Sequence, residues 1–148
     1  MLKEFMSHIR DQVSSNIEKY IGDSNFIERA MKYSALAESK MFRAALVFAS
    51  GDLNNNISNK SLINLSTSIE LMHTYSLIHD DLPSMDNDEL RRGQDSSHVK
   101  FGEANAILVG DALQALSYEI ISDDEDLSSD EKVVAIKLLA SACGKNGM

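Results

Sequence analysis

The stretch that decides the fold is His79-Asp80-Asp81-Leu82-Pro83-Ser84-Met85-Asp86, followed shortly by Arg91-Arg92-Gly93. The carboxylates within residues 80–89 repel one another unless a cation neutralises them. Oxygen ligands suit hard cations, and Mg²⁺ takes a few carboxylates together with waters and substrate phosphates. The alternative is a solvated acidic loop. We favour a metal site, because Asp80 and Asp81 stand at the end of an apolar helical run rather than in a polar linker.

The single proline of the chain lies inside this carboxylate cluster. On a straight helix, six residues rotate by about 600°, so the Asp86 side chain would point about 120° away from that of Asp80. Pro83 ends the helix between them. We therefore predict an irregular turn that brings Asp86 back beside Asp80, where the two could share a metal.

Arg91 and Arg92 follow the carboxylates and have two readings. They could compensate charge on the surface, or their planar guanidinium groups could bind phosphate oxygens in a bidentate way. A metal-bridged diphosphate needs carboxylates to hold the metal and cations to hold the phosphates. We favour this second reading, because neither cluster explains the other on its own.

The rest of the chain predicts an all-α fold in one domain, because Gly and Pro are few and apolar residues recur at helical spacing. A helix that opens at Leu2 ends at Gly22 and Asp23-Ser24-Asn25, and Lys40–Ser50 is apolar on most faces, which predicts burial. Residues 51–56 and 86–102 are predicted loops. The further predicted helices are Phe26–Tyr33, Ser58–Leu82 with an apolar stripe (Leu62, Leu65, Ile69, Met72 and Leu77), Glu103–Ile121 and Lys132–Cys143, the last begun by capping residues 128–131.

Charge and composition narrow the class of protein. A formal net charge of −9 disfavours nucleic-acid binding. We find no signal peptide and no stretch apolar enough to span a bilayer, and the single Cys143 predicts a reducing compartment, so a cytoplasmic location is expected. We expect Cys143 to be a small buried side chain near a helix end, and Asp123-Asp124-Glu125-Asp126 to be a solvated acidic link.

The run from His73 to Gly93, continued by Ser97–Ala104 and Gly110–Leu113, resembles the first aspartate-rich region of bacterial short-chain polyprenyl diphosphate synthases, in particular farnesyl diphosphate synthases. The family places two aspartates, four residues and a third aspartate, as Asp80, Asp81 and Asp86 do here. The resemblance implies the N-terminal part of an isoprenoid-synthase helical bundle. It also implies a Mg²⁺-dependent prenyltransferase that joins isopentenyl diphosphate head-to-tail to an allylic diphosphate, dimethylallyl or geranyl.

The resemblance also assigns roles to residues. Asp80 and Asp86 match the magnesium ligands of the catalytic aspartate motif, which includes Asp81, and Arg91 matches the arginine that touches the allylic diphosphate. The residues that match isopentenyl diphosphate ligands are Lys40, Arg43, His73 and Arg92. By themselves Lys40 and Arg43 are an ordinary pair on one helix face, and His73 an ordinary core histidine. Tyr75 and Ser76 match positions that line the product cavity.

The chain departs from the family pattern mainly at the isopentenyl diphosphate site. Glu38-Ser39 replaces two glycines before Lys40, and Ala44 replaces a proline. Residues 1–148 also lack the family's second aspartate-rich motif, so we expect a single helical domain that is truncated relative to the family. A homo-oligomer is expected. The alternatives are a non-catalytic partner or regulatory subunit of a complete synthase, and a fragment without function.

Overall fold

The computed structural model describes residues 1–53 and 56–147. Helices dominate this part of the chain, so the predicted all-α class is confirmed apart from one short hairpin. The elements are α1 (Leu2–Ile21), α2 (Phe26–Ala35), α3 (Phe42–Asp52), α4 (Asn59–Asp80), β1 (Leu90–Arg91), β2 (Gln94–Asp95), α5 (Ser97–Phe101), α6 (Glu103–Ser122) and α7 (Ser129–Cys143).

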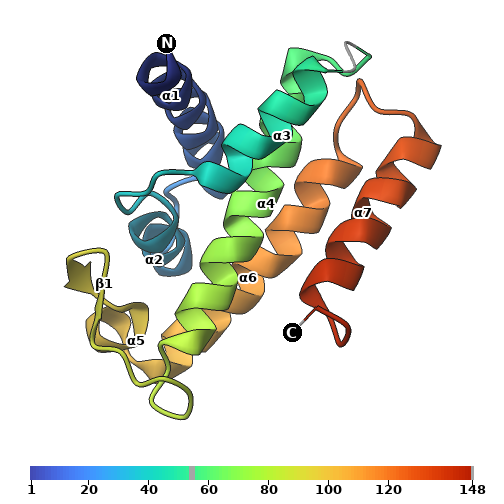
Figure 1. Ribbon diagram of the computed structural model, residues 1–148. Coiled ribbons are helices and arrows are strands. Elements are labelled where there is room, and N and C mark those ends of the chain that lie inside the picture. The colour runs from blue at the N-terminus through green and yellow to red at the C-terminus, as the bar shows by residue number, and fades with distance from the viewer. Residues whose placement is uncertain (54–55, 148) are drawn as a thin grey trace.

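Two long antiparallel helices, α4 and α6, form the centre of the molecule (Figure 1). Helix α3 packs across α4, α1 and α2 lie on one side, and α7 lies on the other side against α6. Because α4 has neighbours on several sides, small polar residues such as Ser66, Thr67 and Ser68 are buried in it as well. The predicted single apolar stripe is therefore wrong in part. Leu62 and Met72 are buried, whereas Leu65, Ile69 and Leu77 are only half-buried.

Glycines allow the closest helix contacts. A Cβ on Gly110 of α6 would lie 2.2 Å from the Nε2 atom of His79 on α4, and a Cβ on Gly51 of α3 would lie 2.3 Å from Leu62. A larger residue at either position would require the side chain of His79 or Leu62 to move. Gly110 thus lets α6 approach the end of α4 that carries His79 and Asp80.

Local sequence signals set most helix ends. Asn25 and Glu28 form a capping box at the start of α2, and Ser128 and Glu131 form another at the start of α7, which confirms the predicted capping residues. Ser58 caps α4 by accepting the N–H of Ser61. The α4 helix ends at Asp80, before Pro83, as predicted.

Helix α3 differs from its prediction in three ways. It begins at Phe42 rather than at Lys40, so Lys40 precedes the helix and does not share a helix face with Arg43. It was expected to be buried on most faces, but Phe42 and Leu46 are 62% and 53% exposed. Only the face with Ala44, Ala45 and Phe48 is buried, because α3 packs on α4 and α1 with that face. Gly51 and Asp52, expected in a loop, belong to α3, and residues 54 and 55 of that predicted loop lie outside the described residues.

The predicted solvated link at residues 123–126 is wrong at its centre, because Asp124 is fully buried. Its Oδ1 atom accepts hydrogen bonds from Ser61 Oγ (2.9 Å) and from the N–H groups of Asp126 (2.9 Å) and Leu127 (3.1 Å). Its Oδ2 atom accepts one from Asn64 (2.8 Å). Burial acts to raise the pKa of Asp124, but these hydrogen bonds outweigh it and the pKa is lowered.

Residues 86–102 are ordered, as predicted, but they contain the β1–β2 hairpin and α5. Gln94 donates to the carbonyl of Tyr33 (3.2 Å), and Tyr33 Oη donates to the carbonyl of Asp95 (3.0 Å), which holds the hairpin against α2. Cys143 is the last residue of α7, as expected, but it is half-buried rather than buried, and partial burial raises its pKa. Within the described residues, no helix combines the length and apolar character needed to cross a membrane.

Candidate diphosphate and metal site

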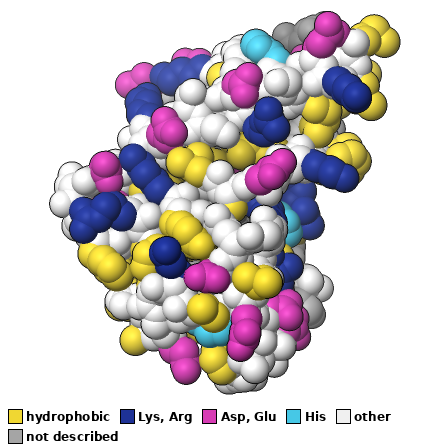
Figure 2. All heavy atoms as spheres, turned by 90° about the vertical axis from the view of Figure 1, so that its left-hand side faces the viewer, with side chains coloured by type: hydrophobic (Ala, Val, Ile, Leu, Met, Phe, Trp, Pro, Cys, Tyr) yellow, Lys and Arg dark blue, Asp and Glu magenta, His cyan; other side chains and the backbone are white. Residues whose placement is uncertain are grey.

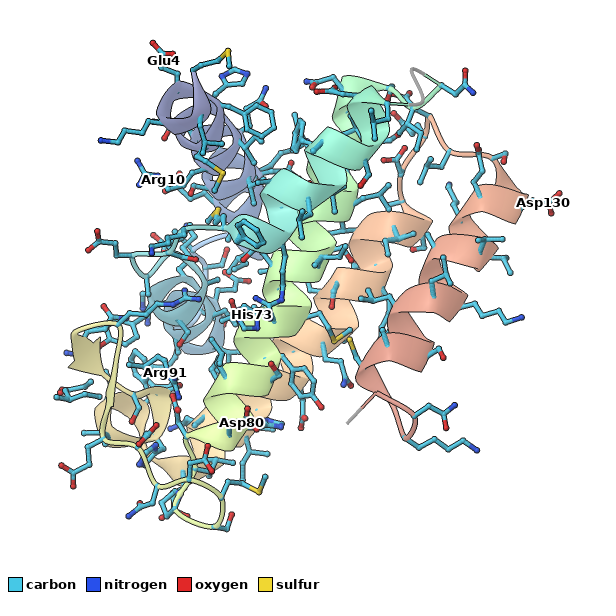
Figure 3. The ribbon with its side chains drawn as sticks, in the orientation of Figure 1. Glu4, Arg10, His73, Asp80, Arg91 and Asp130 are labelled. Atoms are coloured by element: carbon cyan, nitrogen blue, oxygen red, sulfur yellow. The ribbon has the colours of Figure 1, made fainter. Side chains whose placement is uncertain are left out.

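The loop after α4 folds back on the end of the helix. The N–H of Asp86 donates to the carbonyl of Asp80 at 2.8 Å, and the N–H groups of Met85 and Asn87 both donate to the carbonyl of Leu82. The predicted return of Asp86 to Asp80 is therefore present in the backbone. Asp86 is exposed and Asp80 half-buried, so both carboxylates are open to a ligand at the lower end of α4 (Figure 3). Acidic side chains also gather at the lower end of the face in Figure 2.

Asp81 has a different environment from the two aspartates beside it in the motif. It is 2% exposed, and both of its oxygens accept hydrogen bonds from Arg91 Nε at 3.1 Å. Arg91 Nη2 contacts Asp81 as well and lies 3.3 Å from Asp88. The hydrogen bonds that Arg91 donates to Asp81 raise the pKa of Arg91 further, despite partial burial. Asp81 thus fixes the direction of Arg91.

The donor set at the end of α4 fits magnesium only in part. Among residues 1–53 and 56–147, no group of three or more His, Cys, Asp or Glu side chains is arranged to hold a metal ion. Asp80 and Asp86 supply two carboxylates, which is the number that Mg²⁺ commonly takes from a protein when phosphates and waters complete its shell. The residues present therefore fit a cation that arrives with a diphosphate, and do not form a metal cage by themselves.

A basic cluster lies further up α4. His73 is half-buried, and its pKa is lowered to about 4 by burial and then by the positive charges of Arg43, Arg92 and Arg91. The structure therefore brings Arg43, His73 and Arg92 together, as the resemblance implied. At neutral pH His73 carries no charge, so it offers a hydrogen bond rather than a third positive charge.

Arg92 and Lys40 lie at a groove of about 870 Å³ between α1 and the segment before α3. Burial and then the like charges of Arg91 and Arg43 lower the pKa of Arg92, against the opposing effect of Glu70. Neither Lys40, Arg43 nor Arg92 has an ion-pair partner among the described side chains, so these cations remain free to bind an anion.

An apolar groove of about 720 Å³ adjoins the basic cluster. Arg43 and His73 line it, together with Tyr75 and Ser76 of α4. Its remaining walls are apolar side chains of α3, α4, α6 and α7, including Val47, Ile69, Ile121, Leu138 and Leu139. A groove with the Arg43 cation and the His73 hydrogen-bonding group on its border and an apolar interior suits a ligand with an anionic head and a hydrocarbon tail.

Sequence reasoning missed Glu70, which is 5% exposed and accepts the N–H of Ala44 at 3.0 Å. The only signal for it was a lone carboxylate between Lys60 and Asp80 of the helical run, one turn before His73. Sequence reasoning also assigned Asp81 to the catalytic motif but missed its contact with Arg91, because side-chain pairing across a loop leaves no pattern in the sequence.

Comparison with solved structures gives the class of the fold. An FPP/GFPP synthase from Zymomonas mobilis superposes with a TM-score of 0.93 at 38% identity, covering 99% of this chain and 54% of that one. A geranyltransferase from Legionella pneumophila superposes with a TM-score of 0.92 at 36% identity, covering 99% and 52%. The fold is thus the N-terminal half of an isoprenoid-synthase bundle.

Sequence comparison then gives the family. Residues 24–146 match the family described as "Polyprenyl synthetase". The farnesyl diphosphate synthase of Escherichia coli (strain K12) is 43% identical over 143 residues, covering 93% of this chain and 48% of that protein. This chain belongs to the polyprenyl synthetase family, and it spans about half the length of the relatives it matches.

Proposed function

We propose that this chain carries the substrate-binding half of a farnesyl diphosphate synthase-like prenyltransferase. In this proposal Asp80 and Asp86 hold Mg²⁺ on the diphosphate of an allylic substrate, and Arg91 binds the same diphosphate. Lys40, Arg43, His73 and Arg92 bind isopentenyl diphosphate. The observation that carries the proposal is that the half-buried Asp80 and the exposed Asp86 lie at the end of α4, while Arg43 and His73 line an apolar groove along the same helix.

The reaction that the resemblance implies would use this placement. The allylic carbon–oxygen bond ionises and releases diphosphate, the double bond of isopentenyl diphosphate attacks the resulting cation, and the proton that is then lost passes to the released diphosphate. Magnesium supplies charge stabilisation for the departing diphosphate. Arg91, aimed by Asp81, adds a planar pair of donors to that diphosphate. The apolar groove receives the hydrocarbon chain and keeps water from the cation.

The groove also bears on product length. Tyr75 lines it and packs edge-on against His79, with ring centroids 4.9 Å apart. A bulky ring in this position favours a short product. The cytoplasmic location, the homo-oligomer and the lack of nucleic-acid binding remain predictions, as does the alternative of a regulatory partner of a complete synthase.

The proposal is tested by thermal unfolding of the 148-residue chain with a non-hydrolysable allylic diphosphate analogue. At a hundredfold excess over its dissociation constant, the analogue should stabilise the chain by about 2.7 kcal/mol. Most of this should vanish when a chelator removes magnesium. An equal stabilisation with chelator would contradict the metal role, and no stabilisation in either condition would contradict the site itself.

A further inference from the structure

The first turn of α3 lacks a cap of its own. Met41, its N-cap residue, has left-handed backbone angles (φ 43°, ψ 47°) and makes no side-chain capping hydrogen bond. The N–H groups of a first helical turn have no partner within the helix and need one elsewhere. The N–H of Ala44, the third residue of the helix, is bound instead by Glu70 of α4 at 3.0 Å.

Glu70 is a buried carboxylate, and such a group is costly to bury unless it is hydrogen-bonded and electrostatically compensated. The Ala44 N–H and the positive end of the α3 dipole supply part of this compensation. Glu70 also opposes the lowering of the Arg92 pKa, although no ion pair joins the two side chains. The Glu70 side chain thus links α3 to α4.

The anchored turn is the one that carries the diphosphate cations. Arg43 is adjacent to Ala44 in the chain, and Lys40 lies just before the turn. Glu70 and His73 are three residues apart and share a face of α4. Ala44 also stands where the resembling synthases have a proline, which has no N–H, so this hydrogen bond depends on the residue that this chain has at position 44.

We propose that Glu70 is a positioning residue of the isopentenyl diphosphate site, holding the first turn of α3 so that Arg43 faces His73 and Arg92. The inference rests on the proposed function. The negative charge of Glu70 does not help an anion to bind. A neutral acceptor at the same place therefore serves the anion as well as or better than the carboxylate does, whereas loss of the acceptor releases the turn.

Three variants separate the hydrogen bond from the charge. Glu70→Gln keeps an oxygen acceptor for the Ala44 N–H and removes the charge. Glu70→Ala removes both. Ala44→Pro removes the donor and fixes the backbone of the turn by its ring, so Glu70→Ala should matter much less in that background.

The measurement is the affinity for isopentenyl diphosphate by titration calorimetry without magnesium, together with amide exchange of residues 42–45 by NMR. We expect Glu70→Ala to weaken binding about tenfold and to speed exchange of the Ala44 amide by a similar factor. Glu70→Gln should bind within about threefold of the unsubstituted chain or more tightly. Asn64→Ala, which removes a buried hydrogen bond to Asp124 on the same helix, is the control for general destabilisation and should leave affinity unchanged.

The outcomes distinguish the inference from the function on which it rests. Equal weakening by Glu70→Gln and Glu70→Ala, or an equal effect of Glu70→Ala with and without Ala44→Pro, would show that Glu70 acts by charge on Arg92 and overturn the proposal. Should Glu70→Ala fail to fold, Glu70→Gln and the double variant Glu70→Ala with Ala44→Pro still show whether the hydrogen bond or the charge of Glu70 matters. If the unsubstituted chain bound no isopentenyl diphosphate, the proposed function would fall, while amide exchange would still report whether Glu70 holds the turn.

Discussion

Residues 80–89 and residues 123–126 each follow a long helix with a cluster of carboxylates, but they place those carboxylates in opposite environments. After α4, Asp86, Asp88 and Glu89 are exposed, and the buried Asp81 faces a cation, Arg91. After α6, Asp124 is fully buried and is bound by neutral donors of the side chains and the backbone.

The difference shows what makes a carboxylate structural. Hydroxyl and amide donors from α4 and backbone donors from the link after α6 occupy both oxygens of Asp124. In the first cluster Asp80 and Asp86 keep open positions, and Arg91 retains N–H groups for a second anion. The density of acidic residues is similar in both stretches. The hydrogen-bond donors around each carboxylate determine whether it is structural or available to bind a ligand.

The largest effect should come from removing the buried carboxylate. Asp124→Ala leaves the Asn64 amide, the Ser61 hydroxyl and two backbone N–H groups without their acceptor, and should cost about 3–5 kcal/mol of unfolding free energy. Urea denaturation of Asp124→Ala and of the exposed neighbour Asp123→Ala gives a direct comparison. Similar midpoints for the two variants would mean that the network contributes little.

Removal of the exposed aspartates should affect ligand binding instead of stability. Asp80→Ala and Asp86→Ala should each abolish the magnesium-dependent part of the stabilisation by an allylic diphosphate analogue, about 2.7 kcal/mol at a hundredfold ligand excess. Without ligand, both variants should unfold within about 0.5 kcal/mol of the unsubstituted chain, since Asp86 is exposed and Asp80 is only half-buried. If Asp123→Ala lost the ligand effect as well, the cluster would act only as bulk charge.

These two acidic stretches also show how far sequence reasoning reached. The order of helices, the break at Pro83 and the return of Asp86 follow from local rules of periodicity, capping and backbone geometry. The burial of Asp124 depends on Ser61 and Asn64, about sixty residues away on α4, and no local pattern reports such partners. Glu70 and its bond to Ala44 were missed for the same reason, and the exposed face of α3 was missed because periodicity does not tell how many neighbours a helix has.

A smaller effect on stability is expected when the buried ion pair of the first cluster, Asp81 and Arg91, is disrupted. Asp81→Asn removes the charge that aims Arg91, and should cost about 1–2 kcal/mol of stability because Arg91 is partly exposed to water. Arg91→Lys keeps the positive charge but loses the planar fork of donors. It should therefore weaken binding of the allylic analogue, and a higher magnesium concentration should not restore the affinity. Thermal unfolding at several magnesium concentrations measures both, and unchanged binding in Asp81→Asn would mean that Arg91 does not need its partner.

The smallest expected change is in the acid limb of stability, and it follows from the sign of the Asp124 shift. The pKa of Asp124 lies below its usual value of 3.8 in the folded chain, so at pH values between the two the unfolded chain binds more protons. The stability from this ionised carboxylate is therefore fully present above the unfolded pKa and is lost as the pH falls through the folded pKa.

The gap in urea midpoint between the unsubstituted chain and Asp124→Ala should stay constant from pH 7 to about pH 5 and narrow below about pH 4. Asp123→Ala should run parallel to the unsubstituted chain throughout. A gap that persisted unchanged down to pH 3 would mean that the neutral donors hold the protonated carboxyl as firmly as the ionised one, and the contrast between the two acidic stretches would then rest on hydrogen bonding without charge.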